Sequence, residues 1–359
     1  MIYLIGGARP NFMKIAAISR AFEKYDINYE IIHTGQHYDY NMDKIFFEEF
    51  GLKKPLVHLE VGSGPHGEQT AKIMERFERL CFDARPSMVF TVGDVNSTMA
   101  AALVAAKMHI PIAHQEAGMR SHDMKMPEEV NRIVTDHVSD FLFPISPKDQ
   151  SNLHMEGIDR DKIYLVGDPM IDNLLYYIDK IPDMTCEKYI LVELHRPANV
   201  DDKDKLKTIL QALDKLRDHA QILFPLHPRT RKMIEEFELT DLLKNVECWD
   251  PIGYFEFIKY MKNATVVITD SDGIQQETSI LNIPCVSIRD TTNIGYTVKY
   301  GTNVLVEVNI NKIFAAATYP LYHDPFKSNF PKQLKKLNDG NASERIAEVL
   351  INVKKKFFI

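Results

Sequence analysis

Three carboxylates in the first half of the chain have the spacing of a proton-transfer site. Asp94 and Glu116 each follow a short apolar run, and Glu128 comes soon afterwards, with Arg120 and Arg132 nearby. Crowded carboxylates push their pKa values apart, which keeps one of them protonated near neutral pH. The cluster therefore predicts general acid/base catalysis. A solvated group of surface charges is the alternative interpretation.

Two apolar runs in the second half each end in a histidine and a nearby arginine. His195 is followed by Arg196, and His227 is followed by Pro228 and Arg229. These cations at matching positions indicate an anionic ligand, with structural histidines as the alternative. The sequence has no closely spaced ligand set such as HExxH, so we expect no metal site.

Two segments have the composition of phosphate-binding turns. The first apolar run leads into Gly6–Pro10, which contains Arg9, and Lys14 lies one helical turn later. Glycine allows a ligand to approach the backbone, and a helix start offers unpaired amides. Together with the two cations, this segment would suit a pyrophosphate. A tight turn with surface charges is the alternative.

The second segment follows an apolar run that ends at Thr269. The amides of Ser271, Asp272 and Gly273 could hold phosphate oxygens at a helix start, and Glu277, one turn further on, could accept both hydroxyls of a ribose. An ordinary helix N-cap is the alternative. Asp272 fits the phosphate interpretation poorly, because a carboxylate repels a diphosphate.

These residues need a scaffold of strands and helices that alternate along the chain. The expected strands of the first half are Ile2–Ile5, Ile31–Thr34, Met88–Val92, Ile110–His114, Phe141–Ile145 and Ile163–Val166. Those of the second half are Tyr189–Leu194, Gln221–Leu226, Val246–Trp249, Val266–Thr269, Cys285–Ile288 and Val304–Val308. Between them lie stretches with helical periodicity, such as Lys205–Arg217.

Continuously apolar strands that alternate with helices indicate parallel sheets covered on both faces. We therefore predict an α/β protein of two Rossmann-like, doubly wound domains, residues 1–168 and 169–359. Ligands of such sheets bind outside the carboxyl ends of the strands. Two domains that face a cleft would place the site there.

Length and composition exclude several other classes. The chain has 359 residues, 45% hydrophobic and 26% charged, with a net charge of -7. This is an ordinary globular composition, and it gives no reason to expect a nucleic-acid partner. The four cysteines lie far apart, so neither a disulfide framework nor a zinc ribbon is expected. Without a signal peptide or a run of about 20 apolar residues, we expect a cytoplasmic protein with no membrane partner.

The motifs together resemble the non-hydrolysing UDP-N-acetylglucosamine 2-epimerase family, essentially from end to end. The matching stretches are Gly7–Pro10 with Lys14, Thr34–His37, Gly93-Asp94 with Ser97-Thr98, Glu116–Arg120, Pro127–Arg132, Thr135–His137, His195-Arg196, Leu226–Pro228, Thr269–Ser271, Gln275–Glu277 and Arg289–Thr292.

The resemblance implies a glycosyltransferase-B-like pair of Rossmann-like domains, with a last helix that returns to the first domain, and a homodimer. It implies epimerisation at C2 of a UDP-2-acetamido sugar, which interconverts UDP-N-acetylglucosamine and UDP-N-acetylmannosamine. UDP is eliminated to leave a 2-acetamidoglycal, and it adds again after C2 is reprotonated on the opposite face. The reaction needs no cofactor.

The resemblance also implies a role for each matching position. The acid/base groups are Asp94, Glu116, Glu128 and His195. The diphosphate ligands are Arg9, His227, Ser271, Asp272 and Gly273. Glu277 would bind the ribose and Phe257 the uracil, with Lys14 and Arg132 as electrostatic helpers.

The sequence departs from the family pattern at four places. Asp272 stands where the family usually has glycine, Asn11 replaces a glutamate, and 293–296 replaces Glu-Arg-Pro-Glu. Glu68 replaces an arginine in a neighbourhood that, in the family, contributes to a second, activating UDP-sugar site, so we do not expect that regulation here.

The identity of the sugar stays open. Parts of the chain are closer to the branch that acts on UDP-2,3-diacetamido-2,3-dideoxyglucuronate. A hydrolysing relative, a UDP-sugar transferase and a non-catalytic UDP-sugar binder are further alternatives. The carboxylate cluster argues against the transferase, which needs no acid/base groups around C2.

Overall fold

The computed structural model describes residues 1–35, 47–184, 187–292, 294–324 and 327–357, without the side chains of Arg9 and 353–357. The chain forms two compact units, of which the first comprises Met1–Tyr176 and Leu334–Ile359 and the second Tyr177–Gln333. The predicted two-domain α/β fold is confirmed. The first unit extends beyond residue 168, where the sequence placed a boundary, and it also contains the C-terminal segment.

The first unit is built on a six-stranded parallel sheet with the order β3-β2-β1-β4-β5-β6. Its strands are β1 (Ile2–Gly6), β2 (Tyr29–His33), β3 (Val57–His58), β4 (Met88–Val92), β5 (Ile112–Gln115) and β6 (Phe141–Phe143). Its helices are α1 (Arg9–Lys24), α3 (His66–Asp83), α4 (Asn96–Lys107), α5 (Pro127–Val138), α6 (Pro147–Met155), the 3₁₀ helix η1 (Arg160–Lys162), α7 (Pro169–Ile178), α15 (Lys332–Leu337) and α16 (Ala342–Phe357), of which α7 and α15 cross the boundaries of the unit.

The sixth strand of this sheet is β3 and not the expected Ile163–Val166. The latter segment runs beside β6, with hydrogen bonds from Tyr164 N to Leu142 O (2.8 Å) and from Val166 N to Pro144 O (3.2 Å). It forms only an isolated bridge, because Pro144 has no N–H with which to continue the ladder.

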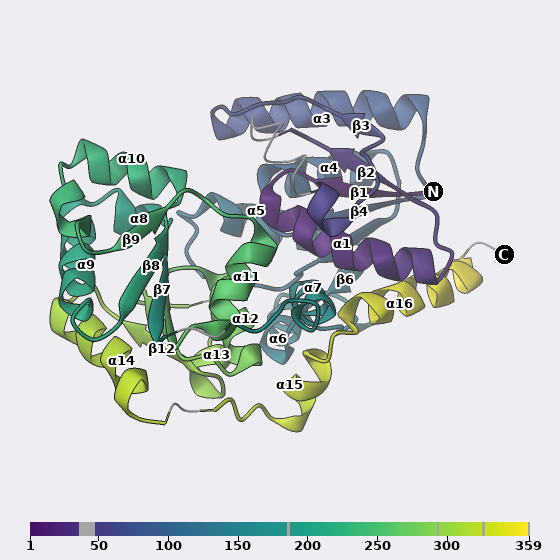
Figure 1. Ribbon diagram of the computed structural model, residues 1–359. Coiled ribbons are helices and arrows are strands. Elements are labelled where there is room, and N and C mark those ends of the chain that lie inside the picture. The colour runs from purple at the N-terminus through teal and green to yellow at the C-terminus, as the bar shows by residue number, and fades with distance from the viewer. Residues whose placement is uncertain (36–46, 185–186, 293, 325–326, 358–359) are drawn as a thin grey trace. The chain divides into compact units, whose positions relative to one another are not determined.

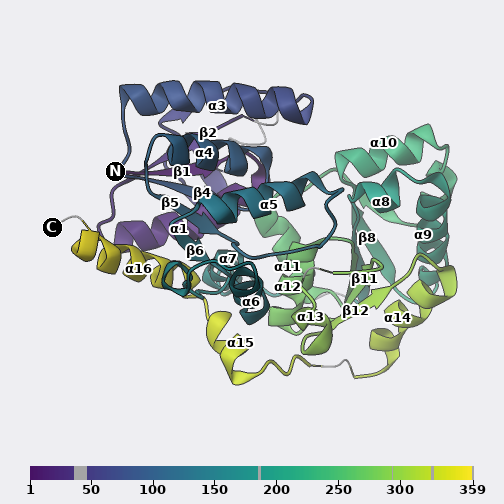
Figure 2. The same cartoon turned by 180° about the vertical axis from the view of Figure 1, so that it is seen from behind.

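Helices cover both faces of this sheet. Apolar side chains of α1 and α16 pack on one face, where Phe12, Ile15 and Ile346 are fully buried. Figure 1 shows α16 lying beside α1. On the other face lie α3 and α4, which Figure 2 shows from behind. The start of α16 is held by Asp172, whose carboxylate accepts the amides of Ala342 (3.0 Å) and Ser343 (2.6 Å).

The second unit has another six-stranded parallel sheet, with the order β12-β11-β10-β7-β8-β9. Its strands are β7 (Tyr189–Glu193), β8 (Gln221–Pro225), β9 (Glu247–Trp249), β10 (Val266–Thr269), β11 (Cys285–Ile288) and β12 (Asn303–Val306). Its helices are α8 (Pro197–Val200), α9 (Lys203–Leu216), α10 (Pro228–Glu236), the 3₁₀ helix η2 (Thr240–Leu243), α11 (Tyr254–Asn263), α12 (Asp272–Leu281), α13 (Tyr296–Lys299) and α14 (Ile310–Tyr322).

Both sheets have the strand order of the Rossmann fold, counted within each unit. In the second unit, α9 and α14 pack on one face through a single apolar core. The stripe predicted for 205–217 lies on α9, and its leucines and isoleucine are buried. Asp202 caps this helix by accepting the amides of Asp204 and Lys205, both at 3.1 Å. Within the described ranges, no helix is long and apolar enough to span a membrane.

Asp149 in the first turn of α6 is buried with little compensation. Ser146 Oγ donates to its Oδ2 at 2.6 Å, and its backbone carbonyl lies against Gly118, which has a φ of +81° and no room for a side chain. Burial raises the pKa of Asp149 from 3.8 to about 6. Between these two values, the folded chain holds a proton that the unfolded chain has released.

We expect stability to fall as the pH rises through this window, and Asp149→Asn to remove that part of the pH dependence. From pH 4 to pH 7, the variant should gain about 2–3 kcal/mol in unfolding free energy relative to the parent chain. Urea unfolding midpoints at several pH values measure this gain. Asp161→Asn, at an exposed carboxylate, is the matched control and should track the parent. Parallel curves for Asp149→Asn and the parent would contradict the expectation.

Candidate functional site

In the first unit, Asp94 and Glu116 lie just past the carboxyl ends of the neighbouring strands β4 and β5. Glu116 has a φ of +72°, a left-handed conformation that is uncommon outside glycine. Gly93 has a φ of +73°, and a Cβ there would come within 3.3 Å of Glu116 Oε2. Glycine at 93 thus lets the two strand ends bring their carboxylates together.

Lys14 of α1 forms a buried ion pair with Glu116. Burial alone would lower the pKa of Lys14, but the negative charges of Glu116, Asp168 and Asp94 outweigh it and raise that pKa. The ammonium therefore stays charged beside Glu116. Lys14, which was predicted to be an electrostatic helper, therefore contacts a predicted acid/base group directly.

Asp94 is held by α5. Arg132 Nη1 donates to Asp94 Oδ2 at 2.6 Å, and Asn131 Nδ2 donates to the Asp94 carbonyl at 2.8 Å. Burial raises the pKa of Asp94, and the charge of Arg132 opposes this shift. Arg132 is itself fixed by Glu129, which accepts its Nε (3.0 Å) and Nη2 (2.8 Å). Asp94 and Glu116 thus each have a cation of their own.

A second layer of buried polar groups supports these strand ends. Both ring nitrogens of His114 contact acceptors, namely Asp136 Oδ1 at 2.7 Å and the Gly93 carbonyl at 2.9 Å. The other Asp136 oxygen accepts the Gly118 amide (3.0 Å) and pairs with Arg120 (2.8 Å). The network fixes the backbone on both sides of Glu116. Arg120 therefore does not pair with the predicted catalytic carboxylates but supports the turn.

The structure corrects the expectation of unpaired amides after β1. Asn11 Oδ1 accepts the amides of Gly7 (3.1 Å) and Ala8 (3.0 Å), and its Nδ2 donates to Val92 O at 3.0 Å. The turn is therefore closed by a side chain of α1, at a position that departs from the family. The side chain of Arg9 lies outside the described residues.

Glu128 lies in the first turn of α5 and is partly buried. Among the described residues it has no hydrogen bond or ion pair that would hold it beside Asp94 or Glu116. The matching positions Gln36 and His37 and the departing residue Asn293 lie outside the described residues.

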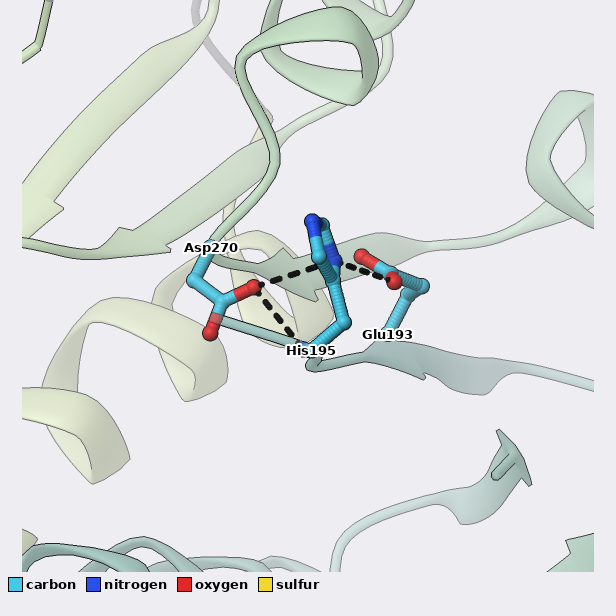
Figure 3. A group of neighbouring side chains, drawn as sticks. All are labelled: Glu193, His195 and Asp270. Atoms are coloured by element: carbon cyan, nitrogen blue, oxygen red, sulfur yellow. Dashed lines mark hydrogen bonds and ion pairs between the residues drawn. The ribbon is translucent and has the colours of Figure 1, made fainter. Parts of the chain in front are cut away.

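In the second unit, His195 lies just beyond β7 and faces two carboxylates (Figure 3). Its Nδ1 is 2.7 Å from Glu193 Oε1 and 3.4 Å from Asp270 Oδ1. Asp270 is fully buried at the end of β10, and its carboxylate also accepts the backbone amides of His195 and Arg196, both at 3.1 Å. The carboxylate of Asp270 therefore ties the end of β7 to the end of β10.

Asp272 is neutralised by two arginines. Its carboxylate accepts Arg196 Nη2 at 2.6 Å and also pairs with Arg289. These two cations offset the charge of Asp272, which weakens the objection that its carboxylate would repel a diphosphate. The amide of Ser271 donates to Thr269 Oγ1 at 3.0 Å and is therefore already engaged. Gly273 follows in the first turn of α12.

The remaining predicted residues lie on three different elements. Glu277 is buried on α12 and accepts the hydroxyl of Tyr254 at 2.7 Å. Phe257 lies on the same helix as Tyr254 and is partly buried. His227 caps α10, and its ring centroid is 5.6 Å from that of His195. The two histidines expected at matching strand ends are therefore neighbours.

One group of described residues offers enough ligand atoms for a metal ion. The atoms of Glu193, His195 and Asp270 lie within 4.8 Å of one another. Asp270 uses its oxygens for backbone amides, and Glu193 uses its own for His195 and Thr269. Hydrogen bonds thus account for this geometry, and we assign no metal to it.

Four groups that hold the site were not singled out from the sequence. Glu129 and Asp136 lie three residues before and four after Arg132, which puts all three on one face of α5. Glu193 lies two residues before His195, the spacing at which side chains of a strand share a face. Both periodicities are legible in the sequence. The role of Asp270 as a backbone acceptor has no such signal.

Known proteins resemble this chain over nearly its full length. The UDP-N-acetylglucosamine 2-epimerase family model matches residues 20–351. The chain is 41% identical to the UDP-N-acetylglucosamine 2-epimerase of Methanocaldococcus jannaschii, over 97% of this chain and 98% of that protein. It is 40% identical to the UDP-2,3-diacetamido-2,3-dideoxy-D-glucuronate 2-epimerase of Pseudomonas aeruginosa, over 97% and 99% of the two chains.

The crystal structure of the Methanocaldococcus jannaschii UDP-GlcNAc 2-epimerase in complex with UDP-GlcNAc and UDP is similar, with a TM-score of 0.85 at 39% identity. The match covers 98% of this chain and 99% of that one. The resemblance read from the motifs is thus confirmed. This protein belongs to the UDP-N-acetylglucosamine 2-epimerase family and is an enzyme of that family.

Proposed function

We propose that the protein interconverts UDP-N-acetylglucosamine and UDP-N-acetylmannosamine. The observation that carries this is the pair of carboxylates at neighbouring strand ends, Glu116 on Lys14 and Asp94 on Arg132. Inverting C2 requires removal of a proton from one face and delivery to the other, so a single base is not enough. Two carboxylates with separate cations can supply these two transfers.

The proposed reaction proceeds by elimination and re-addition. A base takes the C2 proton, a double bond forms between C1 and C2, and the C1–O bond breaks with its electrons passing to the phosphate. The products are a 2-acetamidoglycal and UDP. Proton delivery to the opposite face of C2 and return of the phosphate oxygen to C1 then complete the epimerisation. Glu116, Asp94 and Glu128 are the proposed proton-transfer groups of the first unit.

The second unit is proposed to bind the nucleotide. The Ser271 side chain, the amides of Asp272 and Gly273, His227 and Arg9 would bind the diphosphate, and His195 would meet the leaving phosphate. The two ion pairs that Asp272 makes, with Arg196 and Arg289, support this, because they offset the charge of its carboxylate. Glu277 would accept the ribose hydroxyls, and Phe257 would contact uracil. Assembly as a homodimer and a cytoplasmic location stay predictions from the resemblance.

The same chemistry on UDP-2,3-diacetamido-2,3-dideoxyglucuronate is a second candidate function. The relative that acts on this substrate is 40% identical to this chain, against 41% for the UDP-N-acetylglucosamine 2-epimerase. So small a difference does not separate the substrates. The sugar must be identified by measurement.

Proton NMR of the purified protein with UDP-N-acetylglucosamine in D2O distinguishes these functions. We expect deuterium to enter C2 while the UDP-mannosamine sugar accumulates, because a deprotonated C2 takes its new proton from solvent. Release of free sugar would indicate hydrolysis. Exchange only with the diacetamido-uronate would select the second candidate. Binding of UDP without exchange on either sugar would contradict an epimerase.

Removing either carboxylate charge tests the proton-transfer roles. We expect Asp94→Asn and Glu116→Gln each to lower kcat by about 10²–10⁴-fold, since each variant lacks one proton carrier. Calorimetry should show UDP binding retained, because the proposed nucleotide ligands lie elsewhere. Glu75→Gln, at an exposed carboxylate on α3, controls for loss of charge. Turnover like that of the parent in both variants would exclude the carboxylate mechanism.

A further inference from the structure

Glu193 is a carboxylate that none of the proposed catalytic steps uses, although it touches a residue that one of them does. It is the last residue of β7, and His195 follows two positions later, just beyond the strand. Glu193 Oε1 lies 2.7 Å from Nδ1 of His195. At this distance the Nδ1 proton is donated to the carboxylate.

Glu193 is itself held in place. Thr269 Oγ1 donates to Glu193 Oε2 at 3.0 Å, and the same Oγ1 accepts the amide of Ser271 at 3.0 Å. A continuous set of hydrogen bonds therefore runs from the turn before α12 through Glu193 to the ring of His195. The carboxylate is partly enclosed, with 18% of its side chain exposed.

Figure 3 shows the second ring nitrogen of His195 pointing away from Glu193 and Asp270. Nε2 has no hydrogen-bond partner among the described residues, and the side chain is 36% exposed. With Nδ1 occupied by Glu193, Nε2 is the nitrogen that a ligand can reach.

The charges around His195 favour its cationic form. The titratable groups that face it are Glu193 at the end of β7, Asp270 after β10, the neighbouring Arg196 and His227 at the start of α10. Burial alone would lower the pKa of His195, but the hydrogen bond and charge of Glu193 outweigh it and raise that pKa. Burial would likewise raise the pKa of Glu193, yet its bond to His195 lowers it. The raised pKa of His195 and the lowered pKa of Glu193 both favour an ion pair between the two side chains.

We propose that Glu193 is a positioning residue, which turns His195 so that Nε2 meets the departing phosphate and holds the ring in its cationic form. Nε2–H would donate to the phosphate oxygen as the C1–O bond breaks and its electron pair moves to that oxygen. A charged donor stabilises this developing charge more than a neutral imidazole does. The inference rests on the proposed function in one respect only, namely that the departing group is the phosphate of UDP.

The first test is independent of any substrate. Imidazole NMR titration of the 15N-histidine-labelled protein, with the His195 signal assigned from His195→Gln, follows its pKa and tautomer. We expect Glu193→Gln to lower the pKa of His195 by about one unit or more, because an adjacent negative charge is lost. Glutamine has the same shape and retains an acceptor, so the fold should persist. Glu193→Asp keeps the charge and should recover part of the shift.

Glu247→Gln is the matched control. This carboxylate lies on β9 of the same sheet and bonds to Trp249 instead of a histidine. It should leave the titration of His195 unchanged. An unchanged or higher pKa of His195 in Glu193→Gln would overturn the proposal, as would a parent protein in which His195 carries its neutral-state proton on Nε2.

The second test is the pH profile of kcat/KM. If the cationic ring is required, the basic limb of the profile should move to lower pH in Glu193→Gln by the same amount as the NMR pKa, with little change in KM at low pH. If the basic limb stays in place while the pKa of His195 measured by NMR falls, the proposal that catalysis needs the cationic ring of His195 would be overturned. A parent chain that is inactive on both UDP-sugars would contradict the proposed function. The NMR titration would still decide whether Glu193 controls the pKa and tautomer of His195.

Discussion

The buried ion pair between Lys14 and Glu116 holds the turn on which the first unit's candidate site depends. A left-handed conformation at a non-glycine residue costs about 1–3 kcal/mol and persists only where the surroundings hold it. Glu116 is held at both ends, by Lys14 at its carboxylate and by its amide, which donates to Phe143 O at 3.2 Å. These two contacts maintain a backbone conformation that would otherwise be unfavourable.

Both units use a buried aspartate to fix the loop that carries a site residue. In each, a buried aspartate accepts one or two backbone amides close to an ionisable residue that remains partly accessible. Asp136 does this beside Glu116, and Asp270 does it beside His195. A carboxylate without access to water is costly unless its oxygens are occupied, so it imposes a definite loop geometry. The accessible groups thereby keep fixed positions although they lie on loops.

Much of this architecture was legible in the sequence, because continuously apolar strands and amphipathic helices have distinct periods. The exceptions have local causes. β3 has only two residues and shows no pattern, and Pro144 interrupts the ladder expected beside β6. At the site, residue types indicated the chemistry but not the pairing. Spacing alone does not reveal that Asn11 occupies the amides of the first turn, or that Arg120 pairs with Asp136.

The return of the chain to the first unit also dictates the order in which the two cores can be completed during synthesis. Every residue of the second unit lies between the two segments of the first. The second core can therefore close as soon as Gln333 has left the ribosome. The first sheet must wait for Ile346, Ala347 and Leu350 to cover the apolar face beside α1. Until then that face is exposed to water, so the half of the protein made first is the last to be shielded from aggregation.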